Sequence, residues 1–242
     1  MQLYDEQVFQ QQSKQQIKES TAWNYAKVYL FFALGILVTG AMALFYPMLL
    51  SQMGVSFIGY YISLMVFSIL TVVFSVVASF QRIKGSAVGI AIGYFAYAVC
   101  IGGLVSSFVV FTEDLTTLFY AFLVSGASFL IMGIVGVATR GRLSRFLSLL
   151  LIAIMGLSIV SLFNILLFGN SMLYWIVSIL ILAANLIVAS VDINRVHEKA
   201  KMGQFTSSNV EALYEAYLLY ADFMVIFIYI MRILLIARSS DN

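Results

Sequence analysis

Asp222 is the side chain that apolar packing explains least, because it lies inside a run of large apolar residues near the end of the chain. Leu-Leu-Tyr-Ala precedes it and Phe-Met-Val follows it. The nearest charge on its amino-terminal side is Glu215, seven residues and about 10 Å of helix away. A carboxyl group in such surroundings is costly, so it predicts either a functional site or a neutral acid that holds helices together by hydrogen bonds.

Asp192 is a second acid at the end of an apolar run, and by position alone it could equally be an ordinary residue at the polar edge of that run. Helical spacing places Asn185 on its face at i−7, and it places Glu215 and Tyr229 on the face of Asp222 at i−7 and i+7. If the two helices are antiparallel neighbours, both acids lie at the same end of them. We therefore expect the two acids to meet, with Asn185, Glu215 and Tyr229 as candidate lining residues of a path through the protein.

Two carboxyl groups in an apolar site cannot both ionise at low cost, so such a pair is expected to share a proton and to titrate as one unit. A nearby guanidinium favours the ionised form instead, and Arg82 ends another apolar run at a similar depth. The two resulting arrangements are typical of a pH-dependent switch. Carboxylates are also the usual ligands of calcium. Without an EF-hand-like loop, we expect only transient calcium at Asp192 and Asp222, and no tightly bound metal.

The composition indicates a membrane protein. Of the 242 residues, 62% are hydrophobic and only 10% are charged, and the mean hydropathy is +1.01. Soluble domains contain about 25% charged residues, and one soluble core of this size cannot bury so large an apolar excess. A soluble enzyme, a disordered chain and a disulfide scaffold are therefore excluded, the last because Cys100 is the only cysteine. The net charge of +2 gives no reason to expect a nucleic-acid partner.

Seven stretches are apolar over the roughly 20 residues that a helix needs to cross the hydrocarbon layer. Because backbone amides in lipid need internal partners, each stretch is expected to be helical. The predicted fold is an all-α integral membrane protein, a seven-transmembrane-helix bundle over residues 28–238 between a polar tail (1–27) and a short tail (239–242). Its short connections predict that sequential helices pack as antiparallel neighbours, and the largest loop is expected at 193–212. The predicted spans are 28–50, 55–80, 87–111, 118–139, 146–168, 172–191 and 213–237.

The distribution of Lys and Arg predicts the orientation of the chain. Eleven of the thirteen fall in the first tail and in the second, fourth and sixth connections, whereas Arg238 alone follows the last span and Arg232 lies within it. The amino terminus is therefore expected in the cytoplasm and the carboxyl terminus outside, with the guanidinium of Arg232 reaching the outer surface. Residues 1–27 lack the apolar core of a signal peptide, so we expect a cytoplasmic tail that is either disordered or helical near the membrane.

Two acidic segments carry a resemblance to a known family. They are Glu215-Ala-Tyr-Leu-Leu-Tyr-Ala-Asp222-Phe and Val191-Asp192-Ile193-Asn194. In these segments, and across nearly all seven spans, the chain resembles the Bax inhibitor-1 family (transmembrane Bax-inhibitor-motif proteins), and its bacterial members in particular. The resemblance implies that Asp192 and Asp222 form a pH-sensing dyad, that Arg82 is their alternative ion-pair partner, and that the bundle passes calcium down its gradient. The register of the second helix leaves Lys84 as an alternative to Arg82.

The expected function is accordingly a pH-regulated calcium-leak channel in a bacterial plasma membrane, with calcium, protons and the lipid bilayer as partners and no cofactor. The alternative is a non-conducting membrane interaction protein that modulates proteolysis or a stress response, with a membrane protein bound through the glutamine-rich residues 1–27. An enzyme is not expected. The only histidine, His197, lies in a predicted connection, and the sequence contains no H-E-x-x-H motif.

Overall fold

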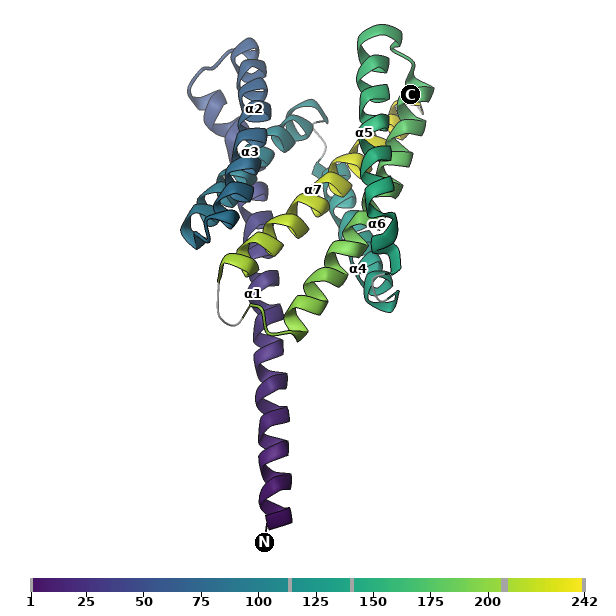
Figure 1. Ribbon diagram of the computed structural model, residues 1–242. Coiled ribbons are helices and arrows are strands. Elements are labelled where there is room, and N and C mark those ends of the chain that lie inside the picture. The colour runs from purple at the N-terminus through teal and green to yellow at the C-terminus, as the bar shows by residue number, and fades with distance from the viewer. Residues whose placement is uncertain (1, 113–114, 140–141, 206–208, 241–242) are drawn as a thin grey trace.

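All regular secondary structure in the part of the chain that the structure describes is helical (Figure 1). This computed structural model describes all residues except 1, 113–114, 140–141, 206–208 and 241–242, and side chains are not described for 2–21, 111–112, 165 and 238–240 either. Lys14, Lys18, Arg140 and Arg238, which entered the orientation argument, therefore lie outside the described side chains. The helices are α1 (Gln2–Gln52), α2 (Phe57–Ile83), α3 (Ala87–Thr112), α4 (Leu115–Ala138), the 3-10 helix η1 (Arg142–Phe146), α5 (Leu147–Phe163), the π-helical turn η2 (Asn164–Phe168), α6 (Ser171–Lys201) and α7 (Asn209–Ser240).

Seven helical segments are long and apolar enough to cross a membrane. One segment lies in each of the helices α1 to α4, α6 and α7, and the fifth runs from η1 through α5 to η2. The prediction of an all-helical protein with seven spanning helices is therefore confirmed over the described residues.

The predicted loop at 193–212 is wrong in extent, because α6 continues to Lys201 and α7 already begins at Asn209. The charged residues that follow position 191 lower the hydropathy, but they do not break a helix. The signal that ends α6 is Gly203, which has φ of 70° directly after the C-cap residue Met202. Both helices thus extend beyond their apolar parts, and their polar ends lie side by side.

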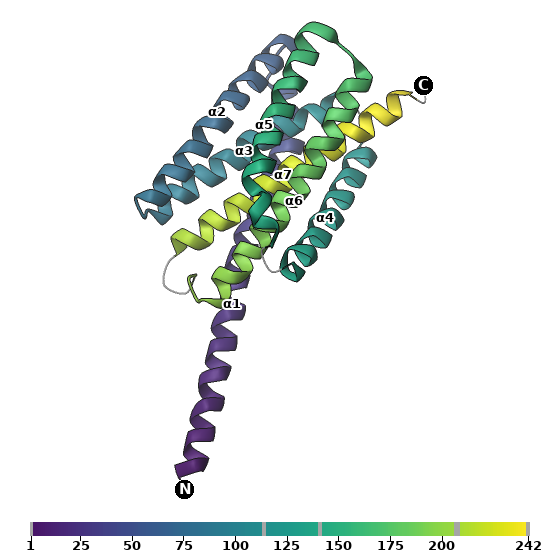
Figure 2. The ribbon, with the colours of Figure 1, turned by 45° about the vertical axis from the view of Figure 1, so that its right-hand side comes forward.

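α7 is the central helix of the bundle. It packs against α6, α1, α4 and α3, and it crosses between the pair α2 and α3 and the pair α5 and α6 (Figures 1 and 2). Leu219, Tyr220, Ile226 and Met231 of this helix are fully buried. In contrast, α2 and α5 lie at the periphery and expose most of their apolar side chains, as helices in contact with lipid do.

Only some sequential helices are close neighbours, so that prediction is partly wrong. The pairs α2 and α3, α5 and α6, and α6 and α7 do pack against each other, whereas α1 packs mainly against α3 and α7, and α4 mainly against α6 and α7. A short turn determines where two helix ends meet, but the rest of each helix can still pack against a different neighbour.

Gly136 of α4 allows the closest approach between α4 and α6, since a Cβ atom there would lie 2.1 Å from the backbone oxygen of Ser190. Gly136→Ala should force the two helices apart and reduce the free energy of unfolding by about 1–3 kcal/mol. Gly126→Ala is the matched control, because a Cβ atom at that position of α4 meets nothing within 4 Å. Thermal unfolding in detergent measures both, and equal melting temperatures for the two variants would contradict this account of the interface.

Candidate functional site

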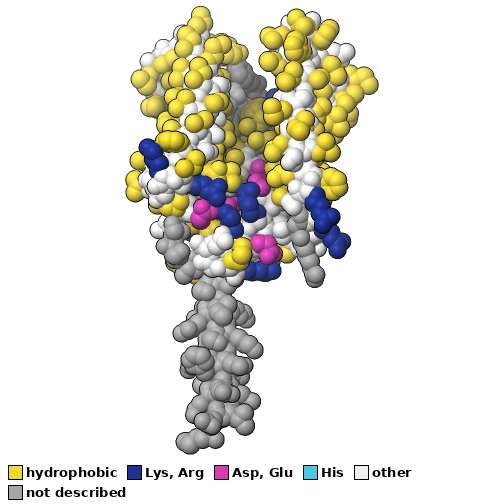
Figure 3. Space-filling view, in the orientation of Figure 1, with side chains coloured by type: hydrophobic (Ala, Val, Ile, Leu, Met, Phe, Trp, Pro, Cys, Tyr) yellow, Lys and Arg dark blue, Asp and Glu magenta, His cyan; other side chains and the backbone are white. Residues whose placement is uncertain are grey.

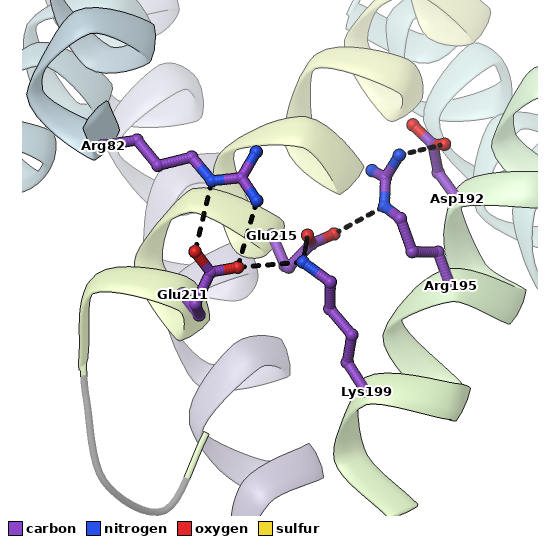
Figure 4. Close-up of polar contacts among 6 residues, drawn as sticks. All are labelled: Arg82, Asp192, Arg195, Lys199, Glu211 and Glu215. Atoms are coloured by element: carbon purple, nitrogen blue, oxygen red, sulfur yellow. Dashed lines mark hydrogen bonds and ion pairs between the residues drawn. The ribbon is translucent and has the colours of Figure 1, made fainter. Parts of the chain in front are cut away.

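Six charged side chains from α2, α6 and α7 form a continuous chain of ion pairs at one end of the bundle (Figures 3 and 4). Helical spacing gathers them, because residues three or four positions apart share one helix face. The α6 members are spaced by three and four residues, and the two α7 members by four. We call this set the ion-pair network: Arg82, Glu211, Lys199, Glu215, Arg195 and Asp192.

The first half of the ion-pair network ties the end of α2 to the start of α7. Arg82 donates through Nε and Nη2 to the two carboxylate oxygens of Glu211, each at 3.2 Å. The guanidinium also lies 4.3 Å from the ring centre of Tyr214, one turn further along α7. Lys199 of α6 then donates to Glu211 at 2.8 Å. Three helices therefore meet at a single carboxylate.

Glu215 is the centre of the network and is only 1% exposed. It accepts from Lys199 Nζ at 2.7 Å and from Arg195 Nε at 3.1 Å. A buried carboxylate without such cations would be strongly destabilising, so both bases are structurally required. Arg195 continues the chain, since its Nη1 lies 3.1 Å from Oδ1 of Asp192.

Asp192 and Asp222 lie next to each other beyond Arg195. Their carboxyl groups are within hydrogen-bonding reach of one another, and a bond between them requires a proton on one, since two carboxylates offer no donor. Within the described part of the chain, Oδ2 of Asp222 is buried without a hydrogen-bond partner. Buried polar atoms in that condition are uncommon, which sets Asp222 apart from the fully paired Glu215.

The charges of the ion-pair network and Asp222, taken together, do not balance when every group is ionised. The seven groups are the acids Asp192, Glu211, Glu215 and Asp222 and the bases Arg82, Lys199 and Arg195. Four negative and three positive charges leave one negative charge in excess. A single proton shared by the two aspartates would remove that excess negative charge, and no additional ion would be needed.

Arg82 contacts Glu211 in this structure, and the base that contacts Asp192 is Arg195. The predicted pairing of Arg82 with an aspartate is thus not the arrangement seen here, and its role as the alternative partner stays a prediction. The ammonium of Lys84 lies 4.8 Å from the ring centre of Phe80, on its own helix.

Two of the predicted lining residues lie away from the ion-pair network. Asn185 donates from Nδ2 to the backbone oxygen of Ile181 on its own helix at 2.8 Å. Tyr229 lies toward the other end of α7, where the guanidinium of Arg232 is 4.9 Å from its ring centre and 4.8 Å from that of Tyr174. Glu215 alone of the three belongs to the network, and it is held by cations.

Sequence reasoning missed Arg195, Lys199 and Glu211 as site residues and counted the two bases only as charges of a loop. The spacing of 192, 195 and 199 on α6 and of 211 and 215 on α7 could have identified them. That signal becomes visible only if both helices are extended past the ends of their apolar runs.

Replacing Lys199 tests whether the network is structural. Lys199→Met leaves Glu215 with one cation and Glu211 with one, so we expect the free energy of unfolding to fall by about 2–3 kcal/mol. Lys201→Met is the control, because Lys201 is 54% exposed and lies 3.7 Å from an equally exposed Glu198, a pair that should contribute little. The stability of both variants is measured by unfolding in detergent. Equal stability would refute the structural role of Lys199 in the ion-pair network.

The chain is similar in sequence to a known family and to bacterial membrane proteins. The family described as "Inhibitor of apoptosis-promoting Bax1" matches residues 22–239. Uncharacterized membrane proteins of Streptococcus pyogenes serotypes M3 and M6 are 32% identical over 146 residues, which is 59% of this chain and 62% of theirs. The matched segment thus spans less than two thirds of those relatives. Since the family match covers nearly the whole chain, from α1 to the end of α7, the protein belongs to the Bax inhibitor-1 family.

Proposed function

We propose that this membrane protein is a pH-regulated calcium-leak channel whose gate is the pair Asp192 and Asp222. It would use no cofactor and catalyse no reaction. The observation that carries the proposal is the adjacency of these two acids, from α6 and α7, at a site with one negative charge in excess. When the pair holds a proton, the site is neutral and α6 and α7 stay together.

Loss of that proton leaves a charge that must be met by a cation. Calcium passing through the protein is one such cation, because carboxylate oxygens are its usual ligands, and it would stay only transiently. Arg82 is the other, and to reach the aspartates it would leave Glu211 and carry the end of α2 with it. The two states of the gate therefore differ in the partner of one guanidinium.

The direction of insertion is part of the same proposal. We propose that the end of the bundle with the ion-pair network faces the cytoplasm of a bacterial cell and that α7 ends outside. The excess of Lys and Arg on one side of the chain supports it. Protons would then reach the gate from the cell interior through the polar ends of α6 and α7.

The dyad is tested by calcium flux from vesicles that contain the full chain and a trapped calcium dye. Asp192→Asn and Asp222→Asn each remove a titrating group, so the ratio of leak rates at acidic and neutral pH should fall toward one. Glu198→Gln is the control, since this acid also lies on α6 but is 53% exposed. An unchanged pH response in both Asn variants would show that the gate is elsewhere.

The same assay tests whether Arg82 or Lys84 is the alternative ion-pair partner of the two aspartates. Without its cationic partner the aspartate pair gives up its proton less readily, so Arg82→Gln should move the midpoint of the pH response to higher pH. Lys84→Gln removes an equal charge two residues away and should leave the midpoint in place. A midpoint that follows Lys84 and ignores Arg82 would reverse the assignment.

A non-conducting interaction protein is the second candidate, and the course of α1 favours it. The spanning part of this helix begins at Ala22, but the helix itself begins at Gln2 and projects from the bundle (Figure 1). Residues 22–27 pack on the bundle, where Tyr25 bonds to Nδ1 of His197 at 2.5 Å. Crosslinking in native membranes with and without residues 1–21 would favour this function if it captured a stable partner while reconstituted vesicles showed no flux.

A further inference from the structure

A cavity of about 360 Å³ lies in the half of the bundle opposite the ion-pair network. Its floor is α7, with Phe223, Met224 and Phe227, and its walls are α1 and the first two turns of α4. α1 and α4 each pack against α7, but they make little contact with one another. The cavity is therefore a groove that opens sideways between α1 and α4.

The groove opens onto the surface that faces lipid. Leu44 of α1 and Phe119 of α4 are 45% and 57% exposed at its sides, whereas the three floor residues are at most 4% exposed. At the end toward the ion-pair network, the ring of Phe223 contacts those of Phe32 and Phe129 at 5.7–5.8 Å between centres. These rings separate the groove from the site of the two aspartates.

The chemistry of the lining excludes polar occupants. Apart from Thr39, the side chains around the groove are hydrocarbon or thioether. The hydroxyl of Thr39 already donates to the backbone oxygen of Ala98 at 3.0 Å and bonds to the hydroxyl of Tyr220. Apolar cavities stay dry and bind apolar molecules, and an unfilled cavity would lose packing contacts along its whole lining.

We propose that this groove binds one acyl chain of a phospholipid from the membrane leaflet opposite the ion-pair network. The bilayer is the medium onto which the groove opens, and its hydrocarbon chains are thin enough to enter. An α-helix of a second copy or of a partner is about 10–12 Å across with its side chains, much wider than one hydrocarbon chain. The site is independent of calcium conduction.

Photo-crosslinking in nanodiscs tests the proposal, with a phosphatidylcholine that carries a diazirine in the middle of its acyl chain. Lipid in the surrounding annulus reaches exposed residues but not the buried floor of the groove. Adducts on Phe223, Met224 or Phe227 are therefore the expected result. Their absence, or their formation only with a diazirine fatty acid that has no headgroup, would overturn the proposal.

A second test fills the groove by substitution and repeats the photo-crosslinking. Gly40 lines it, and a Cβ atom there would meet nothing within 4 Å, so Gly40→Leu should fill the space and lower the α7 adducts several-fold. Gly126→Leu is the matched control, with an equally open Cβ position outside the groove, and should leave them unchanged. Gly40→Ala, which favours the helix, should give an intermediate loss. Equal labelling of all three variants would refute the site.

Discussion

The structure at the polar end of the bundle depends on the neutralisation of one buried carboxylate. Glu215 is almost inaccessible to solvent, and Lys199 and Arg195 are the two cations that hold its charge there. Each of these bases also contacts a second acid, Glu211 or Asp192. Because every member is shared, the position of α2 and the environment of the aspartates are linked through α7. A change of charge at one end of such a chain is felt at the other.

The centre of the bundle explains why α7 can carry this link. Tyr217 bonds to Ser75 of α2 at 2.8 Å, and Tyr220 bonds to Thr39 of α1. The rings of Tyr94 and Tyr97 of α3 pack edge-on against both tyrosines. α7 is therefore fixed along its middle by hydroxyls and rings, so a movement at the proposed gate would involve α6 or α2 more readily than α7.

The sequence was sufficient for the seven spans and for the expectation that the two aspartates lie next to each other, because these follow from hydropathy, from the cost of a charge in lipid and from helical spacing. It was not sufficient for the partners of Arg82 and Asp192. Hydropathy marks where the hydrocarbon layer ends, whereas α6 ends at Gly203, and the residues between these points form the ion-pair network. Which base meets which acid depends on how far the helices extend and how they cross. Neither quantity is encoded in apolar periodicity.

The two sides of Phe223 on α7 thus have opposite surroundings, and a layer of phenylalanine rings separates them. On one side of Phe223 the chain places Asp222 among charges that hydrogen bonds and ion pairs must satisfy. On the other side, the same helix forms the floor of a groove that only hydrocarbon can fill. The stacked rings of Phe32 and Phe129, 5.5 Å apart, complete this layer from α1 and α4. A barrier of that kind keeps lipid from the carboxyl pair and keeps water from the groove.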